Sequence, residues 1–153
     1  MRSLVLLAAL LVAACSTYTD EPSRAELDAI RKAQNVFPAN YKADVTAFLR
    51  NYLNDPTGIR GAAISAPELK DLPTGARYVA CLRYDARKAG GQYAGLKTAL
   101  VVFISGRLDR FVDSPPARDA HGDEQATARR TEVREACKDA SFAPFPELQA
   151  LKR

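Results

Sequence analysis

Two neighbouring segments in the middle of the chain constrain its fold more than any other feature. Residues 77–86, RYVACLRYDA, alternate with the period of a β-strand and place Tyr78, Ala80, Leu82 and Tyr84 on one face. Residues 98–104, TALVVFI, are apolar on both faces, which predicts a central strand that is covered on both sides. Ser105 and Gly106 then provide a two-residue turn into RLDRFVD, so the sequence predicts a tight antiparallel hairpin.

Helical patterns precede these strands. Residues 23–26, SRAE, have the spacing of a capping box and predict a short helix that reaches about Gln34. A second helix is predicted between Asn40, which can cap its start, and Pro56, which prevents its continuation. The aromatic residues of its apolar stripe are explained more simply by core packing than by a ligand pocket. The apolar stripe of this helix consists of Tyr41, Val45, Phe48, Leu49, Tyr52 and Leu53.

The remaining segments complete the predicted architecture. Residues 59–65 predict a strand that Gly61 weakens, and residues 124–138 predict a weakly amphipathic helix. Residues 142–148, FAPFPEL, predict an apolar strap, because Pro144 and Pro146 exclude a helix and the interior of a sheet. We therefore expect an α+β fold: an antiparallel sheet of three to four strands packed on a long amphipathic helix, with a C-terminal helix and strap held by a disulfide.

That disulfide is expected between Cys81 and Cys137, the two cysteines that follow the N-terminal region. An even pair in an oxidising compartment favours a bridge, which would stabilise a loop of this length by about 4 kcal/mol. The bridge would dock the C-terminal helix on the less apolar face of the 77–86 strand. The alternative is two separate buried thiols that pack as small apolar side chains.

The N-terminal region has the pattern of an export signal. Met1 and Arg2 give a positive start, and residues 4–14 form an apolar run that is shorter than the roughly 20 residues of a membrane-spanning helix. The run ends in Val12, Ala13, Ala14 and Cys15, which resembles the lipobox of bacterial lipoproteins. The resemblance implies cleavage before Cys15 and its lipidation, and Ser16 in the next position implies an outer-membrane location facing the periplasm. The alternative is an ordinary signal peptide with a cysteine at its cleavage site.

These features divide the chain into three parts. Residues 1–14 are the expected signal peptide, residues 15–22 the lipidated N-terminus and polar tether, and residues 23–153 a single α+β domain. The formal net charge of +4 is spread along the chain without a long basic run, so we expect no nucleic-acid partner. The expected partners are the membrane, through the lipid on Cys15, and an envelope protein or cell-wall component.

A Gly-rich segment, AGGQYAG, links the two middle strands. Together with Asp55, Pro56 and Cys81, it resembles a pattern in small uncharacterised envelope proteins of Gram-negative bacteria, which implies no activity. Backbone amides freed by the glycines could cradle an anion beside Arg87, Lys88 and Lys97, with Tyr93 exposed to stack on a sugar or a side chain. The alternative is a turn without a ligand.

The sequence offers few residues for catalytic chemistry. His121 is the single histidine, and it lies in the loop segment DAHGDE, whose Asp119, Asp123 and Glu124 match no established metal site. We therefore nominate no catalytic residue, no metal site and no cofactor. The expected function is that of a membrane-anchored envelope lipoprotein with a non-enzymatic binding or structural accessory role, and the alternative is a small periplasmic hydrolase acting on envelope polymers.

Overall fold

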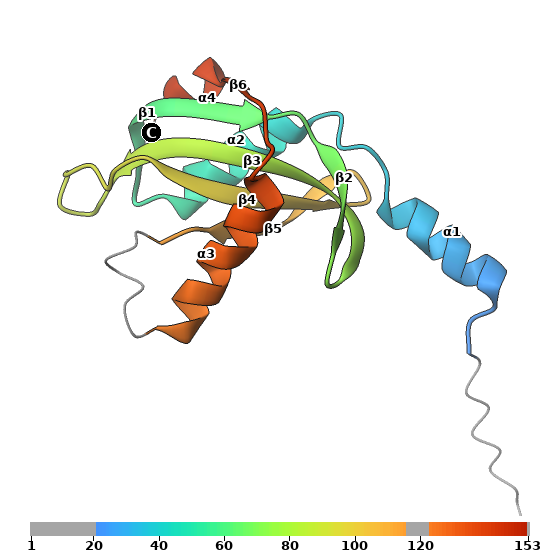
Figure 1. Cartoon of the computed structure of the whole chain (residues 1–153). Helices are drawn as coiled ribbons and strands as arrows, with labels where there is room; N and C mark the ends of the chain where they lie inside the picture. Colours follow the sequence, from blue (N-terminus) through green and yellow to red (C-terminus); the bar gives the residue numbers. More distant parts are fainter. Residues whose placement is uncertain (1–20, 116–122, 153) are drawn as a thin grey trace, which may run out of the picture.

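The computed structural model describes residues 21–115 and 123–152. In these residues an antiparallel six-stranded sheet has the strand order β5-β4-β3-β1-β6, and β2 pairs with β3. The strands are β1 (Asp55–Ser65), β2 (Glu68–Leu72), β3 (Gly75–Arg87), β4 (Lys97–Ile104), β5 (Arg107–Asp113) and β6 (Phe142–Pro144). The helices are α1 (Arg24–Gln34), α2 (Tyr41–Tyr52), α3 (Glu124–Cys137) and α4 (Pro146–Gln149). Figure 1 shows their arrangement.

The predicted central hairpin is confirmed. Strand β4 is buried from Ala99 to Phe103, and it lies between β3 and β5. Ser105 and Gly106 both have positive φ angles, 51° and 74°, as a two-residue turn between right-twisted strands requires. A side chain at Gly106 would also approach Val36 Cγ1 to 3.3 Å, so this turn packs closely on the segment that follows α1.

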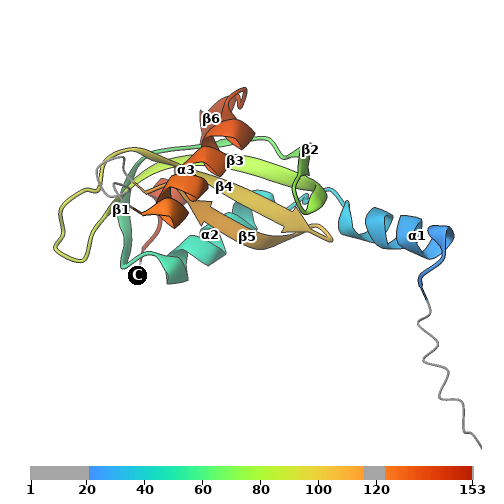
Figure 2. The same cartoon turned by 60° about the horizontal axis from the view of Figure 1, so that its bottom comes forward.

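Two apolar clusters cover the two faces of the sheet. On one face α2 contributes Val45 and Leu49 and α4 contributes Leu148, which pack with Leu82 and Phe103 of the sheet. On the other face Val133 of α3 packs in a smaller cluster. The sheet residues of that cluster are Val79, Cys81, Leu100, Val102 and Val112. Figure 2 shows α2 and α3 on opposite sides of the sheet, which explains why β4 is apolar on both faces.

The predicted sheet of three to four strands on a long amphipathic helix is wrong. The sheet has six strands, and α2 is a helix of 12 residues whose buried side chains are Val45 and Leu49. Strand β2 was missed because ELKDL has no apolar alternation; it forms by pairing with the N-terminal half of a β3 that is longer than expected. Main-chain hydrogen bonds, which sequence periodicity does not reveal, therefore extend the sheet.

The C-terminal strap is also more regular than expected. Residues Phe142–Pro144 form strand β6 at the edge of the sheet, where the missing N–H of Pro144 is tolerated. Pro146 occupies the first turn of α4, where its fixed φ angle suits a helix. The prediction that these prolines exclude a helix was therefore wrong. Phe145, between them, is fully buried and donates its amide to Ala62 O at 2.9 Å.

Helix α1 extends away from the sheet, as Figures 1 and 2 show, and none of its residues is buried. The predicted capping box is confirmed, since Ser23 N donates to Glu26 Oε2 at 2.7 Å and Glu26 N donates to Ser23 Oγ at 3.3 Å. At its other end, Gln34 O accepts the Ser105 amide of the hairpin turn at 3.1 Å. Among the described residues, no helix is both long and apolar enough to cross a membrane.

Candidate functional site

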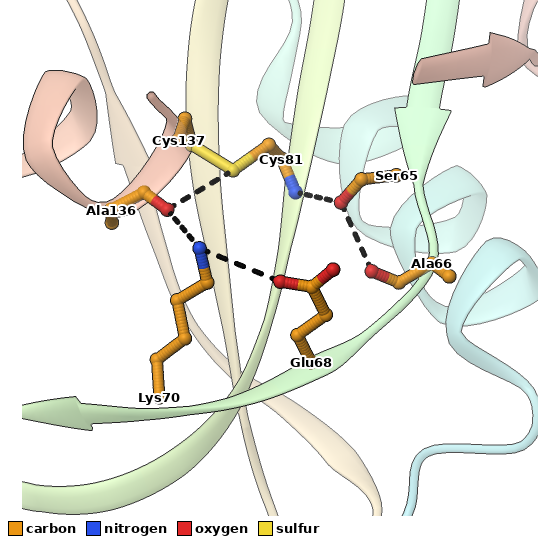
Figure 3. A network of polar contacts seen from close by, with 7 residues as sticks. All are labelled: Ser65, Ala66, Glu68, Lys70, Cys81, Ala136 and Cys137. Atoms are coloured by element: carbon orange, nitrogen blue, oxygen red, sulfur yellow. Dashed lines mark hydrogen bonds and ion pairs between the residues drawn. A yellow bond between two sulfur atoms is a disulfide. The ribbon is translucent and has the colours of Figure 1, made fainter. Parts of the chain in front are cut away.

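The disulfide between Cys81 and Cys137 is present, as predicted, and joins the middle of β3 to the last residue of α3 (Figure 3). Beside it, the Cys81 amide donates to Ser65 Oγ at 2.9 Å. Lys70 of β2 donates its ammonium to Ala136 O at 2.8 Å, which satisfies a carbonyl at the C-terminal end of α3 and places positive charge at the negative pole of the helix. The bridge and Lys70 together fix this end of α3 on the sheet.

An open cleft of about 520 Å³ lies between α3 and the segment that enters β4. The α3 side is lined by Arg130 and Arg134 and by Lys138 at the C-cap of the helix. Their spacing of four residues places them in one row, because the C-cap keeps helical φ and ψ angles. Arg83 of β3 is a fourth basic residue of the lining. The lining also includes Leu96, Thr98, Ser114, Val133 and Phe142.

The electrostatic character of the cleft is strongly positive. None of the described residues that line it is an aspartate or a glutamate. Two of the arginines are held by internal contacts, since the Arg83 guanidinium lies 3.9 Å from the centre of the Phe142 ring and Arg130 Nη1 donates to Pro115 O at 3.4 Å. Arg134 and Lys138 are exposed, and Arg134 pairs at 3.3 Å with the equally exposed Glu135, a contact that water and salt weaken. This cleft is therefore suited to hold an anion.

The structure brings together two of the three residues predicted to bind a partner. Arg87 and Tyr93 form an isolated antiparallel bridge at the base of the Gly-rich loop. The Tyr93 hydroxyl donates to Gly58 O at 2.8 Å, and the Arg60 guanidinium lies 3.5 Å from the centre of the Tyr93 ring. Arg87 also pairs with Asp55 at 3.7 Å. These side chains already have partners within the chain, and their binding role stays a prediction.

The third predicted residue, Lys97, has a different environment. Its ammonium pairs with Asp113 and lies 4.9 Å from the centre of the Tyr84 ring, in the apolar layer that α2 covers. Burial, reinforced by the charge of Asp113, raises the pKa of the Tyr84 hydroxyl. Lys97 also borders the basic cleft, but the contact with Asp113 compensates its charge.

The Gly-rich loop turns as expected at Gly91 and Gly95, whose φ angles are 77° and 96°. Their amides donate within the chain, Gly91 N to Lys88 O at 2.9 Å and Gly95 N to Asp85 Oδ1 at 2.8 Å. Two of the amides that an anion cradle would use are thus already engaged.

The structure describes only some of the residues that were considered for lipidation or metal binding. Cys15, Asp119 and His121 lie outside the described residues. Asp123 caps α3 by accepting the Ala126 amide at 3.0 Å. Within residues 21–115 and 123–152, no group of three or more potential ligands has the geometry of a metal site.

The basic cleft was not predicted, although the sequence contains signals for it. Arg130, Arg134 and Lys138 repeat every four residues in a predicted helix, and Arg83 lies two residues beyond Cys81 on the same face of its strand. The disulfide, which was predicted, brings these two elements together.

Comparisons with protein-family models, curated proteins and solved structures find no match for this chain.

Proposed function

We propose that this protein is a membrane-anchored envelope lipoprotein, attached through lipid on Cys15, whose domain has a non-enzymatic binding role centred on the basic cleft. The observation that carries the proposal is the Cys81–Cys137 disulfide. Such bridges form and persist in oxidising compartments, among them the bacterial periplasm. The bridge uses both cysteines of the domain, so Cys15 is the remaining cysteine of the sequence, and it stands where the lipobox-like pattern requires it.

The geometry of α1 supports a tethered domain. This helix follows the predicted tether and projects from the sheet, and its 11 residues correspond to a length of about 16 Å. A capped helix without buried residues serves well as a spacer, because its loss would not expose the core of the domain. The sheet and its basic cleft would thereby be held away from the membrane surface.

The test is the intact mass of the full chain expressed with its own leader in a Gram-negative host. We expect the mass of residues 15–153 plus acyl chains, in the membrane fraction. We also expect two cysteines that react with an alkylating reagent only after reduction. Multiple acyl chains give stable attachment because each buried methylene contributes about 0.8 kcal/mol.

Two variants control this experiment. Cys15→Ser should abolish acylation and leave the disulfide intact, whereas Cys81→Ala/Cys137→Ala should remain acylated. An unacylated wild-type protein that is cleaved and released to the soluble periplasmic fraction would refute the lipid anchor and favour an ordinary signal peptide.

A further inference from the structure

We propose that the basic cleft binds the phosphate group of an organic phosphoester. One wall of the cleft carries a basic row, Arg130 and Arg134 of α3 and Lys138 at its C-cap, and this row faces the segment before β4, with Arg83 of β3 in the same lining. Besides Lys97, which pairs with Asp113, four basic side chains line the cleft, and no carboxylate does so among the described residues. Arginine forks match the oxygen geometry of a phosphate and form charge-assisted hydrogen bonds with it.

The size and shape of the cleft favour a phosphorylated organic molecule over a free ion. A volume of about 520 Å³ falls in the range of small-molecule sites and is far larger than inorganic phosphate requires. The basic row extends over about 12 Å, from Arg130 of α3 to Lys138 at its C-cap. A ligand that occupies the cleft thus has room for an uncharged portion beside its phosphate.

The walls supply contacts for that uncharged portion. Leu96, 65% exposed, and the ring of Phe142 offer apolar surface, and the Thr98 and Ser114 hydroxyls can donate or accept hydrogen bonds. This mixture of apolar surface and a few polar groups is the usual composition of a ligand site.

The cleft is also ordered in advance of binding. The disulfide fixes the C-terminal end of α3, Arg83 lies against Phe142, and Arg130 is held by Pro115 O. Side chains that are already positioned lose less conformational entropy when a ligand binds. The fold therefore already provides part of the free energy needed to bring these like charges together.

The inference rests on the binding role proposed above but not on the lipid anchor. It is tested by isothermal titration of the full-length protein, purified in a non-ionic detergent. Glucose 6-phosphate represents soluble phosphosugars, and glycerophosphoglycerol represents the headgroup of an anionic phospholipid. Inorganic phosphate, glucose and glycerol separate the contribution of the phosphate from that of the uncharged portion.

We expect at least one of the two organic phosphates to bind with a Kd below about 1 mM, and more tightly than inorganic phosphate. The probe that binds identifies the source of the phosphate. Arg134→Gln/Lys138→Gln should lower the affinity about tenfold, because it removes two charge-assisted contacts. The matched control is Arg31→Gln/Lys32→Gln, which removes the same charge from exposed positions of α1.

Two results would overturn the inference. One is the absence of binding by both organic phosphates at about 10 mM. The other is an equal loss of affinity in the cleft variant and the α1 variant, which would show a response to net charge alone. The cleft variant and the α1 variant both change exposed side chains. Arg130→Lys keeps the positive charge but loses the guanidinium fork, so it tests the cleft without a change in net charge. Failure of the lipid anchor leaves these measurements unaffected, so the two proposals are refuted separately.

Discussion

The Cys81–Cys137 bridge should account for a large share of the stability of the domain. It closes a loop over a sequence separation of 56 residues, for which the chain-entropy relation gives about 4 kcal/mol at 25 °C. Domains of this size are commonly stable by only about 5–15 kcal/mol. We therefore expect Cys81→Ala/Cys137→Ala to lower the free energy of unfolding by about 4 kcal/mol.

The loss should be concentrated in α3. This helix buries only Ala126 and Val133 of its 14 residues, so apolar packing alone holds it weakly on the sheet. The bridge and the contact from Lys70 hold its C-terminal end. In the variant, the amides of α3 should exchange with deuterium by local opening, while those of β3 and β4 stay protected up to global unfolding.

Urea unfolding followed by circular dichroism, together with hydrogen exchange, measures both effects. The urea m-value should rise in the variant, because the denatured chain is no longer restrained by the cross-link and exposes more surface. Cys15→Ser, which keeps the bridge, is the control. A loss below about 1 kcal/mol, with α3 amides as well protected as before, would show that packing and not the bridge holds this helix.

Three further substitutions test other contacts. Lys70→Met should cost about 1 kcal/mol in urea unfolding, because it leaves Ala136 O without its charged donor. Burial raises the pKa of the Tyr84 hydroxyl, so this hydroxyl ionises at a lower pH in the unfolded chain than in the folded one. The free energy of unfolding should therefore fall by about 1.4 kcal/mol per pH unit above about pH 10. Tyr84→Phe should reduce this pH dependence, measured by guanidinium unfolding at alkaline pH. An unchanged pH dependence would show that Tyr84 does not cause it. Tyr93→Phe removes the donor to Gly58 O and should lower stability by about 0.5–1 kcal/mol in thermal unfolding; no change would argue against a structural role for this hydroxyl.

The parts of the fold that sequence reasoning identified are those with a strong local signal. The apolar run of β4, the Ser105–Gly106 turn and the capping box at Ser23 each follow from a few adjacent residues. The disulfide followed from the number of cysteines and the expected compartment. The missed elements are all short. Strand β6 pairs with a partner far away in the chain, and α4 begins at a proline, whereas β2 forms a local hairpin with β3 but lacks apolar alternation. Pro144 and Pro146 show this most clearly, because their positions at a sheet edge and a helix start are set by the tertiary structure.

The basic cleft belongs to two elements that are far apart in the chain, and the predicted disulfide was the one signal in the sequence that they meet. Helix α3 carries Arg130 and Arg134 in one row with Lys138 at its C-cap, and β3 carries Arg83. Gathering four cations beside one another destabilises a folded protein through mutual repulsion. The bridge, two residues from Arg83 and three from Arg134, opposes this repulsion covalently. A cleft whose charges oppose folding is easiest to explain when an anion occupies it. The variant Arg134→Gln/Lys138→Gln should therefore lose affinity for organic phosphate, while the unliganded domain becomes equally or more stable.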